Sequence, residues 1–178
     1  MDERVDLLRI EFNKLQLEKW IESSLFSAHW WITLFISLFF LIVFILLIDR
    51  NRKQEIILAF LISFIFIGMV NEIGYYFNLW DYPTEFIVFL QTFNAVDFLS
   101  VPIVITLLYQ FFSRWKYFLI ANVITSSIMG FIAIPIFTFF GFYEINNEKW
   151  GLFQSFLLLF IITLVVKSLM HSLKRDTK

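Results

Sequence analysis

Apolar residues dominate five stretches of the chain, and short polar or charged segments separate these stretches. They cover residues 29–48, 55–80, 85–112, 115–143 and 150–170. An α-helix needs about 20 such residues to cross the hydrocarbon core of a bilayer. Runs such as LFFLIV at 38–43 lack the alternating polar positions of a barrel strand. The sequence therefore predicts an all-α, polytopic transmembrane helix bundle of about five spans.

Composition supports a membrane protein and argues against other classes. The 178 residues are 60% hydrophobic and only 16% charged, with a mean hydropathy of +0.78, whereas a soluble domain has about 25% charged residues. A net charge of −1 provides no basic field for nucleic acid. The absence of cysteine removes disulfides, thiolate nucleophiles and cysteine-ligated metals. We expect the lipid bilayer as a partner, and no nucleic acid, cofactor or metal.

The chain divides into an amino-terminal helical extension at 1–28, a transmembrane domain at 29–173 and a basic tail at 174–178. Residues 2–24 contain no glycine or proline, which favours a helix. Its apolar positions form two narrow stripes rather than one broad face: Val5, Leu8, Phe12 and Leu15 on one side, and Ile10, Leu17 and Ile21 on the other. Two interpretations stay open. The segment binds a protein partner or a second copy, or it is a solvated helix that leans on the membrane.

Lysine and arginine residues predict the orientation of the spans. Eight fall on one side, at Arg50, Arg52, Lys53, Arg114, Lys116, Lys174, Arg175 and Lys178. Five fall on the other, at Arg4, Arg9, Lys14, Lys19 and Lys149. Because short cytoplasmic loops are enriched in basic residues, we expect an outside amino terminus and a cytoplasmic carboxyl terminus.

Polar side chains inside the second and third stretches are the candidate functional residues: Asn71, Glu72, Gln91, Asn94 and Asp97. Polar residues are costly at mid-membrane, so each is a functional hypothesis by default. Gln91, Asn94 and Asp97 follow i, i+3 spacing and would share one face of a helix. If that face meets Glu72, two acids lie in one buried cluster. Pro102 is expected to kink the third span.

Two interpretations of this cluster compete. Two close carboxylates in a low dielectric cannot both ionise cheaply, so one of them would handle protons or cations. Alternatively, the same carboxyl and amide groups hold neighbouring helices together by hydrogen bonds.

Short scattered motifs carry a resemblance to a known group of proteins. They are Tyr82-Pro83, Asp97, Pro102, Tyr109-Gln110, Trp115-Lys116 and Lys149-Trp150. Over about residues 29–170 the chain resembles small multi-spanning membrane proteins of unknown function from endospore-forming Gram-positive bacteria. The resemblance implies a plasma-membrane protein in a sporulation-associated context, and it assigns no catalytic residue.

The sequence thus favours a non-enzymatic integral membrane protein that acts through membrane partners or an envelope assembly. A small proton- or ion-coupled permease that uses Glu72 and Asp97 is the alternative, and an intramembrane enzyme is the third hypothesis.

Overall fold

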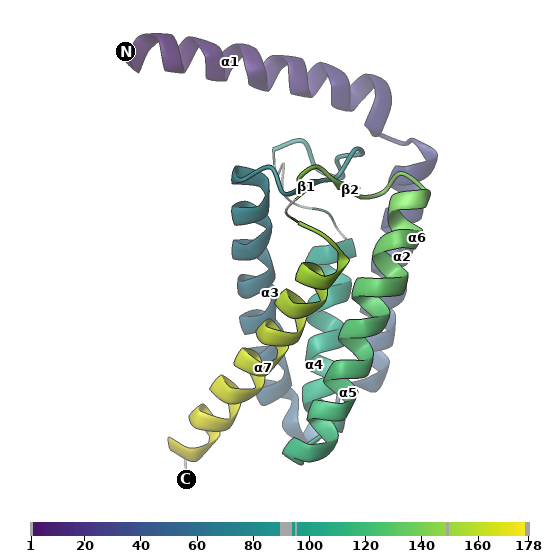
Figure 1. The fold of residues 1–178 in the computed structure, drawn as a ribbon, viewed down its shortest axis with the longest axis vertical. Helices are drawn as coiled ribbons and strands as arrows, with labels where there is room; N and C mark the ends of the chain where they lie inside the picture. The colour runs from purple at the N-terminus through teal and green to yellow at the C-terminus, as the bar shows by residue number, and fades with distance from the viewer. Residues whose placement is uncertain (1, 90–93, 95, 149, 177–178) are drawn as a thin grey trace.

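The computed structural model describes residues 2–89, 94, 96–148 and 150–176, and these residues form an all-α bundle (Figure 1). Among them, four helices are long and apolar enough to cross a membrane, and a fifth apolar helix is shorter. In chain order the elements are α1 (Asp2–Lys19), η1 (Trp20–Ser24), α2 (Ala28–Leu47), η2 (Arg50–Arg52), α3 (Lys53–Tyr76), β1 (Trp80–Asp81), η3 (Val96–Ser100), α4 (Val101–Phe111), α5 (Trp115–Ile128), η4 (Met129–Ala133), α6 (Ile134–Phe139), β2 (Glu144–Ile145) and α7 (Leu152–Asp176).

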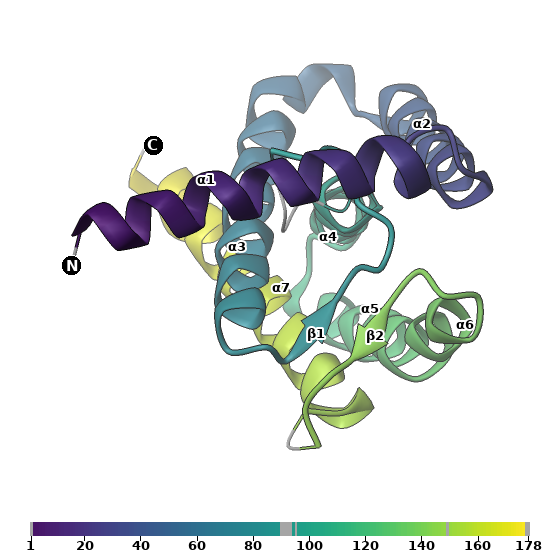
Figure 2. The same ribbon diagram turned by 90° about the horizontal axis from the view of Figure 1, so that it is seen from above.

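The apolar helices run up and down along one long axis, whereas α1 lies across one end of the bundle (Figures 1 and 2). We call this end, with the connections that follow α3 and α6, the loop end. The connections that follow α2 and α4, together with the carboxyl end of α7, form the basic end. This antiparallel order agrees with the order of spans expected from the sequence, and the four long apolar helices support a membrane-embedded bundle.

Helix α3 packs against both α4 and α7, and the core lies along these contacts. Ala59 of α3, Ile105 of α4 and Val166 of α7 are almost fully buried in one cluster. A Cβ at Gly130 would lie 2.9 Å from the Cβ of Phe156, so the lack of a side chain lets η4 approach α7 closely. On the outside, large apolar side chains stay exposed, for example Leu46 at 76%, as expected where lipid is the solvent.

The third span is shorter than expected. A helix beginning at residue 85 is wrong: the described helical residues begin at Val96 and end at Phe111. The Trp20 indole N–H instead donates to the Glu85 carbonyl oxygen at 3.1 Å, and the Trp30 indole N–H donates to the Phe86 carbonyl oxygen at 3.1 Å. These bonds tie Glu85 and Phe86 to η1 and α2. At the start of the described part of the third helix, Asn94 Oδ1 accepts from the Val96 N–H at 2.9 Å, as an N-cap side chain does.

Pro102 lies near the start of α4, directly after the π-helical turn η3. Proline has no amide hydrogen and its ring crowds the preceding turn, so the regular α-helical bonding of the helix from Val96 to Phe111 is interrupted at this position. The structure therefore places Pro102 at the junction of η3 and α4.

The second stretch also ends earlier than expected, because α3 stops at Tyr76 and Trp80 belongs to β1. Asn78 turns the chain with a φ of 48°, and Trp80–Asp81 then pairs antiparallel with Glu144–Ile145. The Trp80 ring lies against Gly74, where a Cβ would stand 2.2 Å from it. The turn at Asn78 thus places the Trp80 indole against α3.

Residues 2–24 are helical, as expected, and α1 exposes both of its apolar stripes. Leu8 is 57% exposed on one stripe and Ile10 is 66% exposed on the other. Lys19 approaches Glu85 to 4.0 Å, which links the carboxyl end of α1 to the loop end of the bundle. The role of residues 2–24 in binding a partner or a second copy stays a prediction.

Candidate functional site

A cavity of about 800 Å³ lies among the helices in the half of the bundle near the loop end. Its walls come from α2, α3, η3, α4, α5, η4, α6 and α7, and most of its lining side chains are apolar. Ligand pockets usually measure about 300–1,000 Å³ and combine an apolar lining with a few placed polar groups. The cavity has both properties.

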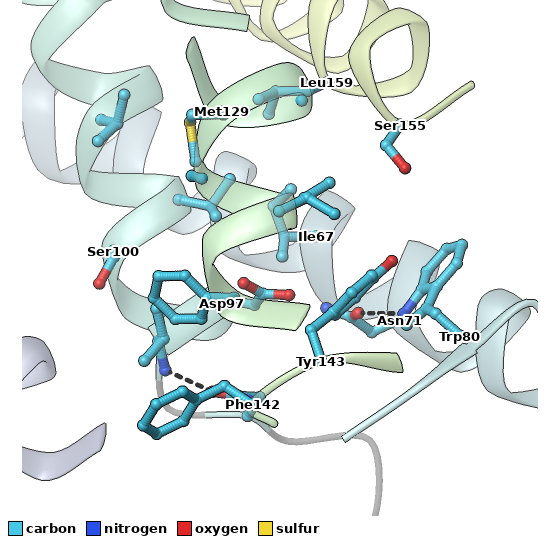
Figure 3. Close-up of a pocket in the computed structure, with 18 of the residues that line it drawn as sticks. Ile67, Asn71, Trp80, Asp97, Ser100, Met129, Phe142, Tyr143, Ser155 and Leu159 are labelled. Atoms are coloured by element: carbon cyan, nitrogen blue, oxygen red, sulfur yellow. Dashed lines mark hydrogen bonds between the residues drawn. The ribbon is translucent and has the colours of Figure 1, made fainter. Parts of the chain in front are cut away.

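One end of the cavity is polar. The Tyr82 hydroxyl bonds to Asn71 Oδ1 at 2.8 Å and also to Asp97 Oδ2. The Trp80 Nε1–H donates to the same Asn71 Oδ1 at 3.3 Å. Asn71 comes from α3 and Asp97 from the first turn of the short third helix, so Tyr82 bridges two elements. Figure 3 shows the Asp97 carboxylate among Asn71, Ile67 and Tyr143.

The number of hydrogen atoms available for bonding among Asn71, Tyr82 and Asp97 bears on the charge that this cluster carries. Trp80 Nε1 can only donate, so Asn71 presents its oxygen as an acceptor. The Tyr82 hydroxyl has a single hydrogen for two neighbouring oxygen atoms. Among the described residues, a proton on Asp97 would supply a second hydrogen, and all three groups would then be satisfied without a net charge.

Two tyrosine hydroxyls border the polar end. Burial raises the pKa of Tyr82 and the pKa of Tyr143 above the ordinary value of 10.0, because a buried phenolate would lose its hydration. Both phenols therefore stay protonated at physiological pH and can donate hydrogen bonds.

Ser100 adds a further polar group to the cavity lining. Its side chain is only 5% exposed, and within the described residues its Oγ has no hydrogen-bond partner. A buried polar atom left without a partner is costly. A hydroxyl or carbonyl group of a bound molecule would satisfy it.

Three of the five expected cluster residues lie at the cavity. Asn71, Asn94 and Asp97 line the cavity, whereas Glu72 lies on the exposed surface of α3, and Gln91 falls outside the described residues. Glu72 therefore does not share the cavity that Asp97 lines. Glu72 follows Asn71 directly, and successive residues of a helix point about 100° apart, so only one of the two can face the bundle interior.

Sequence reasoning missed the aromatic residues of the site. Trp80, Tyr82 and Tyr143 look like membrane-interface residues in the sequence, because each lies near the end of an apolar stretch. In the structure they are 6%, 8% and 8% exposed and form one buried cluster. These residues come together because β1 pairs with β2, and no pattern in the sequence predicts this pairing.

A second polar cluster lies at the basic end and joins three helices. Glu55 of α3 bonds to Arg52 at 2.8 Å, to Lys174 of α7 at 3.2 Å and to the hydroxyl of Tyr109 of α4. Lys167 of α7 donates to the Phe112 carbonyl oxygen at 2.9 Å. These groups satisfy one another and hold the basic end together.

Comparisons with known proteins add no assignment. The chain matches no protein-family model, and no curated protein or solved structure is significantly similar to it. Within the described residues, His, Asp and Glu side chains form no group of three that could hold a metal ion. The cavity and its polar end are therefore the features from which function must be argued.

We predict that Tyr82→Phe lowers the free energy of unfolding by about 1–3 kcal/mol, because Asn71 and Asp97 lose their shared hydroxyl in a buried setting. Tyr76→Phe is the matched control, since Tyr76 is 81% exposed, and it should change stability by less than about 0.5 kcal/mol. Denaturant unfolding in detergent measures both. Equal effects of the two substitutions would show that the Tyr82 bridge contributes nothing specific.

Proposed function

We propose that this chain is a non-enzymatic membrane protein whose cavity binds one amphiphilic small molecule. The observation that carries the proposal is the union of a large apolar cavity with a single polar end at Asn71, Tyr82 and Asp97. An apolar body fits the lining, and a polar head group fits the cluster.

The head group that suits this end is uncharged. The cluster is satisfied without net charge when Asp97 is protonated, and the Tyr143 and Ser100 hydroxyls lie along the same cavity. A hydroxyl head can both donate and accept, so it matches such a set. A carboxylate or ammonium head would need a counter-charge, since a buried unpaired charge is very costly.

The permease alternative has less support. It was motivated by two close carboxylates that exchange a proton, but Glu72 is exposed and does not line the cavity that contains Asp97. Asp97 remains as one acid among aromatic and amide groups, an arrangement that suits hydrogen bonding to a ligand.

The location follows from the distribution of charge. We propose a plasma-membrane protein with the loop end outside and the basic end in the cytoplasm, because Arg50, Arg52, Lys53, Arg114, Lys116, Lys174 and Arg175 all belong to the basic end. Membership of a sporulation-associated group of membrane proteins stays a prediction.

Binding can be measured through the tryptophans of the cavity. Trp80 and Trp150 line it with ring centroids 4.9 Å apart, so a bound brominated long-chain alcohol, dibromo-octadecanol, should quench them by contact. In nanodiscs we expect saturable quenching by this probe. Val104→Phe, which fills space on the α4 wall, should weaken binding about tenfold, or about 1.4 kcal/mol.

Val123→Phe is the control, because Val123 is 44% exposed on the outside of α5 and does not line the cavity. It should bind like the unchanged protein. Quenching that rises in proportion to the probe in the bilayer, equally in all three proteins, would contradict the proposed function.

The absence of native cysteine gives a clean test of orientation. Asn51→Cys lies at the exposed basic end and Glu148→Cys in the exposed connection after β2. In intact cells we expect an impermeant maleimide to label Glu148→Cys and not Asn51→Cys, and to label both after the cells are opened. The reverse pattern in intact cells would overturn the orientation.

A further inference from the structure

The lining of the cavity is not buried equally on all sides. Three lining residues remain largely exposed: Phe35 at 62%, Phe39 at 61% and Ile128 at 49%. The first two belong to α2 and the third to the end of α5. The described lining residues from α3, η3, α4 and α7 are buried or half-buried. The cavity therefore reaches the outer surface between α2 and α5.

The arrangement of the helices agrees with an opening at this place. Helix α2 makes its main contacts with η3 and α4, whereas the lining of the cavity continues from Phe35 and Phe39 to Ile128 on the other side. Seen from the loop end, α2 and α5–α6 stand apart with α4 set back between them (Figure 2). We call the residues Phe35, Phe39 and Ile128 the portal.

Near the loop end, α2 is tied to the chain that follows α6. His29 Nε2 lies 2.9 Å from the Phe140 carbonyl oxygen, and the His29 ring packs against Phe142 at 4.7 Å. Phe142 is itself part of the cavity lining. His29 thus bounds the opening on this side and links the start of α2 to the residues that follow α6.

In the part of the chain that the structure describes, packed side chains lie at both ends of the cavity. At the loop end, Trp80, Tyr82 and Tyr143 cover the cavity and are each at most 8% exposed. Toward the basic end, the tightly packed cluster of Ala59, Ile105 and Val166 fills the space between α3, α4 and α7. An opening between α2 and α5, on the apolar outer surface of the bundle, would face the hydrocarbon of the bilayer.

We infer that the ligand of the cavity is a membrane-dissolved amphiphile that enters and leaves sideways, from the bilayer, through the portal between α2 and α5. This inference rests on the proposed function, and it makes that function more specific. The ligand belongs to the lipid phase, with a chain that passes between Phe35, Phe39 and Ile128 and a hydroxyl head that reaches the Asp97 end.

The experiment measures exchange rates of dibromo-octadecanol in nanodiscs by stopped-flow quenching of tryptophan fluorescence. The double variant Phe35→Ala/Phe39→Ala widens the portal, and its side chains face lipid, so the fold should persist. We expect association and dissociation both to become at least about threefold faster, with the equilibrium affinity changed less than the rates. The matched control is Ile42→Ala/Ile45→Ala, on the same helix at 55% and 61% exposure and outside the cavity; its rates should not change.

A second variant acts in the opposite direction. Phe39→Cys/Ile128→Cys, bridged by a flexible bismaleimide and verified by mass, ties α2 to α5 across the portal and should slow both rates. Its control is Ile128→Cys/Ile132→Cys, bridged along one helix, because Ile132 does not line the cavity. Rates that are the same in widened, bridged and control proteins, with saturable binding intact, would overturn the portal alone. Loss of saturable binding already in the unchanged protein would instead overturn the proposed function.

Discussion

The bridge from the Tyr82 hydroxyl to Asn71 and Asp97 ties the connection after α3 to two helical elements of the bundle. It brings a residue from the connection after α3 into the bundle and fixes it against both α3 and the start of the third helix. The indole bonds to the Glu85 and Phe86 carbonyls hold the same connection against η1 and α2, and the described part of the third helix begins at Val96. The space beside this short helix is the cavity, and the same bridge is its polar end.

The position of the polar cluster at one end of the cavity gives a reason for its presence in a membrane bundle. Hydrogen bonds between polar side chains in membrane proteins contribute only about 0.6–2 kcal/mol each to stability. This stabilisation is small compared with the cost of burying an acid, an amide and a phenol. A cluster at the end of an apolar cavity has a second use, since it can orient the head group of a bound amphiphile. The polar groups at the basic end differ from this cluster. Glu55 pairs with both Arg52 and Lys174, and none of the three lines the cavity.

Much of the architecture could be predicted from the sequence, because helix formation in lipid is forced by backbone hydrogen bonding. The all-α bundle, the helical extension and the polar character of Asn71, Asn94 and Asp97 followed from hydropathy and spacing. The early end of α3, the late start of the third helix and the exposure of Glu72 did not. Each depends on contacts between distant residues, such as Trp20 with Glu85 and Trp80 with Asn71, and a local pattern contains no information about them. Tyr82 shows the limit most clearly, since an aromatic residue at a span end usually marks the membrane interface.

Native mass spectrometry of the full chain, released from nanodiscs made with its own membrane lipids, decides whether the cavity holds a ligand. We expect a complex with a single uncharged amphiphile that survives mild activation, at about one molecule per chain. This complex should be lost or strongly reduced in Val104→Phe but retained in Val123→Phe. The same distribution of lipid adducts in all three proteins, with no species held more firmly than the others, would contradict the claim that this cavity is a binding site.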